Sequence, residues 1–156
     1  MTTIVASVTH GCMSADTRVV NAGPMYPADK IFRIGDSLFG TAGDAFMSLV
    51  FLEWLNTKRD KAEIRKTFEH QDKDAFVVIE LGPEGIKLWN GWGVPEKLHC
   101  PHYAIGSGAM SAQHAMNRGD DPEDAIKASM ELDEATGGEI QTMHLIPPEL
   151  KPRRKR

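Results

Sequence analysis

The spacing of apolar residues changes several times along this chain of 156 residues, and these changes limit the folds that it can adopt. Runs of β-branched and small residues, typical of strands, occupy residues 3–8, 12–20 and 30–43. From Ala45 the apolar residues recur at helical spacing, which predicts a helix that ends near Arg59. Its wide apolar face consists of Phe46, Leu49, Val50, Leu52, Trp54 and Leu55.

The rest of the chain continues with further helices and strands. Residues 60–70 predict one further short helix, and the apolar run AFVVIEL is typical of a buried strand. A meander of turns and strands follows, and we expect the segment HYAIGSGA to close it. The last elements expected are a helix after Gly108, a helix over 120–136 with Asp121 as its cap, and a strand over 139–146.

Strands, helices, strands, helices and a final strand therefore follow one another without a repeat. This segregation favours a layered α+β fold over alternating βαβ units. The length suits a domain with its own core, so we expect a single domain over residues 1–156, with a basic tail at about 148–156.

Composition argues against several classes of protein. A formal net charge of -4 gives no general case for nucleic-acid binding, although the last residues, LKPRRKR, are basic. Two cysteines make no disulfide framework. No secretory signal is recognisable, and no run approaches the roughly 20 apolar residues that cross a bilayer. We therefore expect a cytoplasmic protein whose partners include neither nucleic acid nor a membrane.

The first two strands bring a charged residue close to the start of the chain. A turn at His10 and Gly11 pairs Thr2 with residues 17–19 across an antiparallel hairpin. Asp16 then lies within a residue or two of Thr2.

The next two runs predict a second hairpin, which turns at Asp36 and Ser37. This register puts Lys30 opposite Gly43, and a slip of one or two residues still leaves them neighbours. Each hairpin thus places a charged side chain at a strand end beside a small or hydroxyl-bearing residue.

Thr2 can act as a nucleophile in such a setting. A threonine hydroxyl needs a base, and the amine that removal of Met1 frees on the same residue has a pKa near 7.7 to 8.0. Lys30 would lower the pKa of both groups, Asp16 would hold that lysine, and the N–H of Gly43 would donate to an oxyanion. Met-Thr-Thr alone favours an ordinary strand start, so the catalytic interpretation depends on these neighbours.

Five motifs occur in the order and approximate spacing of a known family: TTIVA, GCMSADTRVV, KIFRIGDSLFGTAGDAF, YAIGSGAMSAQHAM and DEATGGEIQTMHL. From Thr2 to about Ile146 the chain resembles proteasome β-type subunits and the HslV-like threonine peptidases of the N-terminal nucleophile type. The resemblance implies a four-layer αββα sandwich, with two antiparallel sheets between helix layers. It also implies a homo-oligomeric ring or double ring around a proteolytic chamber. Unfolded proteins or peptides would be the substrates, and an AAA+ ATPase unfoldase is an expected partner.

The resemblance assigns roles to the residues that the hairpins bring together. Thr2 resembles the nucleophile and its amine the base. Asp16 and Lys30 resemble the charged pair that activates it, and Gly43 falls where the family has its oxyanion N–H.

Three further catalytic positions are implied by the resemblance alone. Ser107, Asp133 and Thr136, the last in place of a serine, resemble residues that hydrogen-bond the amine and the nucleophile. No cofactor is required for this chemistry. The family binds a cation through backbone carbonyls near the end of its last long helix, which implies a structural cation site, of unknown metal, at residues 132–136.

The chain departs from the family pattern in three places. GTAGDAF is about two residues short after Gly43, and the carboxylate of the adjacent Asp44 would narrow or recharge the substrate pocket. The segment between the first long helix and AFVVIEL is also short, which puts the family's second helix in question. The basic tail continues past the last strand, where it either docks on a partner or has no role.

Three functions stay open on this basis. The first is a threonine endopeptidase subunit, the second a small-molecule amidase with the same nucleophile, and the third a catalytically silent ring or scaffold subunit. A metal cluster at His99, Cys100 and His102 is disfavoured, because their spacing matches no zinc pattern and suits a solvated loop.

Overall fold

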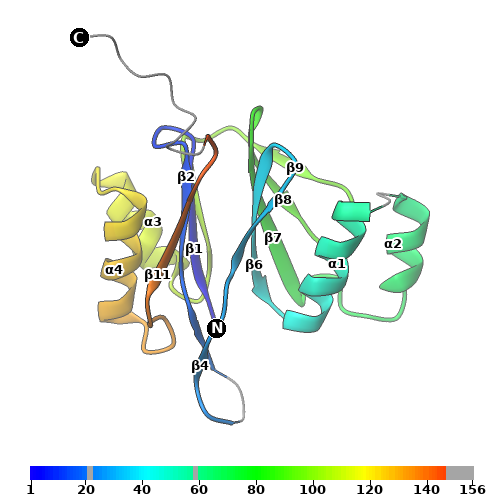
Figure 1. Cartoon of the computed structure of the whole chain (residues 1–156), viewed down its shortest axis with the longest axis horizontal. Coiled ribbons are helices and arrows are strands. Elements are labelled where there is room, and N and C mark those ends of the chain that lie inside the picture. The colour runs from blue at the N-terminus through cyan, green and yellow to red at the C-terminus, as the bar shows by residue number, and fades with distance from the viewer. Residues whose placement is uncertain (21–22, 58–59, 147–156) are drawn as a thin grey trace.

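The computed structural model describes residues 1–20, 23–57 and 60–146. Figure 1 shows two β-sheets that face each other, with helices on the outer side of each. The strands are β1 (Thr3–Ser7), β2 (Cys12–Asp16), β3 (Arg18–Val19), β4 (Tyr26–Pro27), β5 (Ile31–Ile34), β6 (Ser37–Gly43), β7 (Phe76–Gly82), β8 (Gly85–Trp89), β9 (Glu96–Leu98), β10 (His102–Gly106) and β11 (Ile140–His144). The helices are α1 (Ala45–Thr57), α2 (Lys61–Thr67), α3 (Ala109–Asn117) and α4 (Pro122–Leu132).

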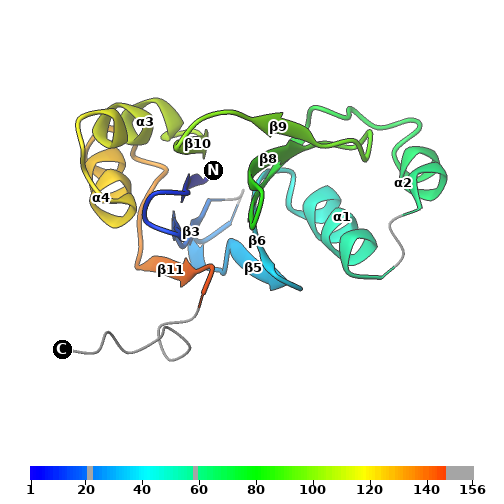
Figure 2. The same cartoon turned by 90° about the horizontal axis from the view of Figure 1, so that it is seen from above.

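The four-stranded sheet has the antiparallel order β10-β1-β2-β11, and α3 and α4 cover its outer face (Figure 2). Side chains alternate along β1, so that Val5 packs toward the helices while Ile4 and Ala6 point to the other sheet. Asp121 caps α4 as predicted, since its carboxylate accepts the N–H of Asp124 at 3.0 Å.

The five-stranded sheet has the antiparallel order β5-β6-β7-β8-β9, and α1 packs against its outer face. Aromatic rings fill the space between this sheet and helices α1 and α2: Phe39, Phe51, Trp54, Phe68, Phe76 and Trp89. The α+β class predicted from the order of elements is therefore confirmed.

A second core joins the two sheets. Ile4 and Met13 from one sheet meet Leu38 and Ile79 from the other, and all four are fully buried. The sheets approach closely at Gly40, where a Cβ atom would lie 2.9 Å from Cγ2 of Ile4. This core fixes the two hairpins relative to each other, and the site described below lies at one end of it.

The predicted apolar face of α1 is wrong in part. Leu52, Trp54 and Leu55 are buried, but Phe46 and Leu49 are 83% and 57% exposed. This helix is apolar on nearly every side, so periodicity alone cannot choose the face that packs on the sheet. The fold leaves an apolar strip of α1 on the surface.

The first hairpin forms with a register two residues from the predicted one. Ile4 lies opposite Ala15, because the turn begins one residue after Ser7, whose Oγ accepts the N–H of His10 at 3.2 Å. The run predicted over 12–20 is also broken into β2 and β3. A shift of two residues keeps every side chain on its face of the sheet, so Asp16 still lies beside the start of β1.

The second hairpin is displaced from its predicted register in the same way. Ile31 lies opposite Gly40, and Lys30 is therefore the neighbour of Thr41, whose N–H donates to the carbonyl of Lys30 at 3.1 Å. Gly43 lies two residues farther along β6. Lys30 and Gly43 remain at the same end of the hairpin.

The structure also decides two expectations about the middle of the chain. The segment HYAIG does not close the meander, because β10 pairs with β1 in the other sheet. The family's second helix, which the short segment between α1 and β7 put in question, is present as α2. Arg59 and the basic tail lie outside the described residues. Among the residues that are described, no helix is long and apolar enough to span a bilayer.

Candidate active site

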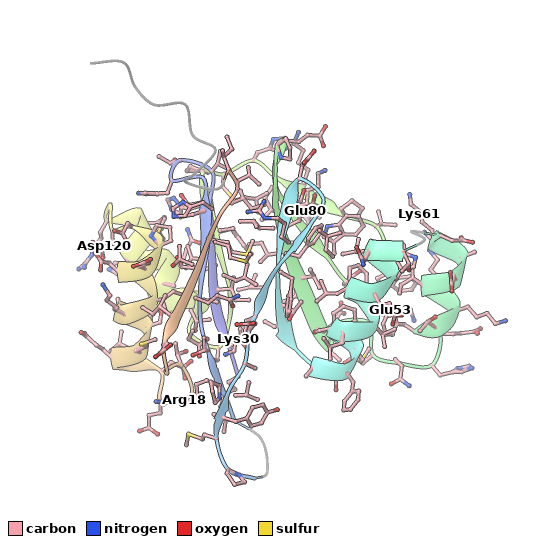
Figure 3. All side chains as sticks on the ribbon, viewed as in Figure 1. Arg18, Lys30, Glu53, Lys61, Glu80 and Asp120 are labelled. Carbon is pink, nitrogen blue, oxygen red and sulfur yellow. The ribbon has the colours of Figure 1, made fainter. Side chains whose placement is uncertain are left out.

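A buried ion pair lies where the start of β1 meets the end of β2 and the start of β5. The Nζ atom of Lys30 is 2.9 Å from Oδ1 of Asp16, and their side chains are 6% and 0% exposed. Figure 3 shows Lys30 at the end of the molecule that holds the N-terminus, with Arg18 farther out. The two hairpins therefore bring together the charges that the sequence predicts there.

All three ammonium protons of Lys30 have acceptors. Besides Asp16, the Nζ atom donates to the carbonyl oxygens of Arg18 at 2.6 Å and Met1 at 3.1 Å. Burial lowers the pKa of Lys30, and its hydrogen bond and charge interaction with Asp16 only partly oppose this effect. The ammonium group is thus held against the peptide bond that joins Met1 to Thr2.

Asp16 connects three parts of the chain. Its Oδ1 atom accepts the N–H of Thr3 at 2.8 Å as well as Lys30, and its Oδ2 atom accepts the N–H of Gly137 at 3.1 Å. These three hydrogen bonds offset the free-energy cost of burying the charged carboxylate. It also fixes the start of β1 relative to the loop after α4.

A second network flanks Thr2 on its other side. The N–H of Ser107 donates to the Thr2 carbonyl at 2.8 Å, and the hydroxyls of Ser107 and Thr136 both donate to Oδ2 of Asp133 at 2.6 Å. These two hydrogen bonds are the main reason that the pKa of Asp133 lies below its ordinary value. The three residues implied by the resemblance therefore form one network, in which Ser107 and Thr136 both contact Asp133.

Thr3 belongs to this network, although the sequence does not single it out. Its hydroxyl lies 2.6 Å from that of Thr136 and accepts the N–H of Gly108 at 3.1 Å. Thr3 is fully buried, so it does not face a substrate. By contrast, the hydroxyl of Thr2 makes no hydrogen bond to another described residue and is the one left available for reaction.

Gly43 ends β6 beside Thr2. Its φ of +101° is strained for other residues, and a Cβ atom there would lie 2.3 Å from the carbonyl oxygen of Ala75. Gly43, Thr2 and Ser107 line one cleft of about 290 Å³. An N–H on a residue without a side chain suits an oxyanion, since nothing blocks the approaching carbonyl.

The carboxylate of Asp44 has a structural role that differs from the expected one. It accepts the N–H of Met47 at 2.8 Å and so caps α1, while the backbone N–H of Asp44 donates to Ala75 at 2.9 Å. Asp44 is absent from the lining of the cleft beside Thr2. In the short GTAGDAF segment, α1 thus begins at Ala45, with Asp44 as the single residue between it and Gly43.

Replacing Asp44 by alanine is expected to lower the free energy of unfolding by about 1 kcal/mol, because one N–H at the start of α1 loses its acceptor. Urea unfolding measures the change, and Asp44→Ser, which keeps a capping oxygen, is the matched control. An alanine variant with wild-type stability would contradict this role.

The loop expected to bind a cation already receives donors from the protein. Nη1 of Arg18 donates to the carbonyl of Glu134 at 2.9 Å, and the N–H groups of Thr17 and Arg18 donate to the carbonyl of Gly137. The guanidinium supplies a positive charge at one of these carbonyls. The carbonyl-bound cation stays a prediction, and the chemistry proposed below does not use it.

Other candidate ligands do not gather into a metal site. His102 is hydrogen-bonded through Nε2 to Asn117 at 2.8 Å. Within residues 1–20, 23–57 and 60–146, no group of three or more His, Cys, Asp or Glu side chains is placed to hold a metal ion.

The two sheets and their outer helices define a layered α+β fold in which Thr2 lies directly before the inner strand β1. Among solved structures, the chain is similar to Thiobacillus denitrificans BPH in complex with epoxomicin, with a TM-score of 0.70, 20% identity, and coverage of 93% of this chain and 100% of that one. A second Thiobacillus denitrificans BPH structure gives a TM-score of 0.67, 22% identity, and coverage of 94% and 98%. Eukaryotic HslV from Trypanosoma brucei gives a TM-score of 0.69, 20% identity, and coverage of 90% and 97%.

This chain therefore has an HslV-like fold, and the predicted resemblance is confirmed at the level of the fold. No protein-family model and no curated protein sequence matches it. The likeness that the comparisons find thus lies in the backbone, at 20–22% sequence identity.

Proposed function

We propose that this protein is the threonine-type endopeptidase subunit of a proteasome-like or HslV-like ring, with Thr2 as its nucleophile once Met1 is removed. The observation that carries the proposal is the buried Asp16–Lys30 pair, whose ammonium group is hydrogen-bonded at the Met1–Thr2 peptide. An ion pair with a purely structural role would not need the additional hydrogen bond from the Lys30 ammonium group to the carbonyl oxygen of Met1.

The reaction would proceed through an ester on Thr2. The free amine of Thr2 takes the hydroxyl proton while Oγ1 attacks a peptide carbonyl, and the proton passes to the departing amine as the peptide bond breaks. The same amine then takes a proton from water as the resulting hydroxide attacks the ester; the ammonium returns this proton to Oγ1 as the ester bond breaks, and the carboxylic acid product departs.

The surrounding residues would act by charge and orientation. The positive charge of Lys30 favours the deprotonated hydroxyl, and the N–H of Gly43 donates to the oxyanion of the tetrahedral intermediate. Ser107 contacts the Thr2 carbonyl and Asp133 contacts Ser107, and both would hydrogen-bond the Thr2 amine after Met1 is removed. Thr136 would keep the Asp133 carboxylate in place.

We further infer that the four layers in Figure 1 are the αββα sandwich of N-terminal nucleophile hydrolases, and that copies assemble into a ring or double ring. The HslV neighbour and the exposed apolar strip of α1, with Phe46 and Leu49, support an assembly of copies. Unfolded proteins or peptides would be the substrates, an AAA+ unfoldase a partner, and the cytoplasm the location.

The proposal is tested by exposing Thr2 on demand. The chain is produced behind a cleavable N-terminal fusion partner whose removal leaves Thr2 as the first residue, and an intact mass verifies the start. Cleavage of peptides and of an unfolded protein, alone and with an ATPase, is expected after release and absent before it, because only release frees the amine. A released protein that cleaves neither contradicts the proposal.

The same experiment separates the two alternatives. A small-molecule amidase would hydrolyse simple amides without cleaving proteins and would not need a ring, which native mass spectrometry reports. A silent scaffold subunit would assemble but hydrolyse nothing, and would retain Met1 when it is produced without a fusion partner.

The size of the cleft beside Thr2 also bears on its substrate. Its volume of about 290 Å³ is at the small end of ligand pockets, which favours recognition of the single side chains of a peptide.

The pH profile should have two limbs. As pH rises, kcat/KM is expected to increase through the pKa of the Thr2 amine, about 7.7 to 8.0 when unperturbed, because the base must be unprotonated. It should fall again below the ordinary lysine value of about 10.4, because burial lowers the pKa of Lys30 and its positive charge is lost on deprotonation. Steady-state rates over this range test the profile, and a rate independent of pH contradicts it.

A further inference from the structure

The lining of the cleft beside Thr2 includes one acidic residue, Asp74, which the catalytic network does not use. Asp74 is exposed, and its backbone N–H donates to Oδ1 of Asp72 at 2.9 Å. Its carboxylate makes no hydrogen bond or ion pair with any residue that the structure describes. The charge is therefore available to a ligand in the cleft.

The backbone around Asp74 is held in place next to Gly43. The N–H of Ala75 donates to the carbonyl of Asp72 at 3.1 Å, and the carbonyl of Ala75 accepts the N–H of Asp44 at 2.9 Å. Phe76 is paired with Gly43 across β6 and β7. These contacts preorganise Asp74 on the segment that borders the expected oxyanion N–H, so little order has to be gained on binding.

Neighbouring charges do not neutralise Asp74. The Nζ atom of Lys73 lies 4.6 Å from the centre of the Trp92 ring, and both residues line a different cleft. The carboxylate of Asp44 caps α1. Apart from the hydroxyl-bearing residues Thr2 and Ser107, the other side chains of the cleft lining are apolar, among them Phe76 and Val77.

We propose that Asp74 determines specificity, by selecting substrates with a lysine or arginine side chain next to the scissile bond. Such side chains combine an apolar stem with a terminal cation, which matches an apolar wall that carries one carboxylate. The inference rests on the proposed function, since it names the substrate class of the same site.

The test uses the full chain released from its fusion partner and pairs of peptides. In each pair a single lysine, or acetyl-lysine with the same stem and no charge, is moved along an alanine and leucine background, and mass spectrometry locates the cleaved bond. The wild-type protein is expected to cleave beside lysine about fivefold faster in kcat/KM, an effect that salt reduces.

Two variants with the same change in net charge complete the experiment. Asp74→Asn is expected to make the two rates equal. Asp36→Asn, which removes a carboxylate from the β5–β6 turn, should keep the wild-type preference. Thermal unfolding shows whether each variant is folded, and the wild-type comparison of the two peptides tests the inference without any variant.

The outcomes distinguish this inference from the proposed function. Wild-type protein that cleaves both peptides equally, or a folded Asp74→Asn variant that keeps the preference, overturns the role of Asp74 and leaves the peptidase proposal intact. Wild-type protein that cleaves no peptide at all overturns both.

Discussion

The Thr2→Ala variant is expected to lose peptide hydrolysis by about 10⁴-fold or more, because the attacking oxygen is removed while the amine remains. Its stability should stay within about 1 kcal/mol of wild type, since the Thr2 hydroxyl is not hydrogen-bonded to another described residue. Both proteins are released from the fusion partner, so that both begin at position 2. Peptide cleavage and urea unfolding are then measured on the same samples.

Thr2→Ser is the matched control for this variant. It keeps a hydroxyl and an N-terminal amine, so we expect it to retain substantial activity, in contrast to alanine. Hydrolysis that continues unchanged in Thr2→Ala would show that the nucleophile is elsewhere, or that a contaminating peptidase is being measured.

Lys30→Met should have the second largest effect, and on two quantities at once. The variant leaves the Asp16 carboxylate buried without its cation, which costs about 3 to 5 kcal/mol of the free energy of unfolding for a broken buried pair. Activity should also fall, because the positive charge held at the Met1–Thr2 peptide, next to the proposed nucleophile, is lost. Chemical unfolding and kcat/KM report the two losses separately.

The double variant Asp16→Asn/Lys30→Met separates stability from catalysis. Removing both charges should recover part of the stability, because no uncompensated carboxylate remains in the interior. Activity should not recover, since the cation is still missing. Recovery of activity along with stability would mean that Lys30 supports only the fold.

Some of the site follows from local sequence alone. The two hairpins predict that Asp16 and Lys30 approach the start of the chain, and this holds even though both registers are wrong by two residues. Antiparallel strands have a side-chain period of two, so an error of two moves a residue along its face without turning it away. The capped start of α4 at Asp121 is similarly local.

Other parts of the site needed a resemblance or the structure itself. Ser107, Asp133 and Thr136 lie more than a hundred positions from Thr2, and no local pattern connects them to it. The contact between the Thr3 and Thr136 hydroxyls could not be inferred from either segment. The likeness in fold to proteins at 20% identity persists because burial and strand pairing constrain the backbone more than they constrain individual residues.

The sequence by itself determined the order of strands and helices and the position of Thr2 directly after Met1. It also determined that the two hairpins bring the charges of Asp16 and Lys30 close to Thr2. Those properties depend on turns and periodicity, which act over a few residues. Only the tertiary structure decided which face of the largely apolar helix α1 is buried, that Asp44 caps this helix, and that Asp74 is among the residues lining the cleft beside Thr2. These outcomes depend on how two sheets and their helices pack together, and packing joins segments whose separation along the chain carries no local signal.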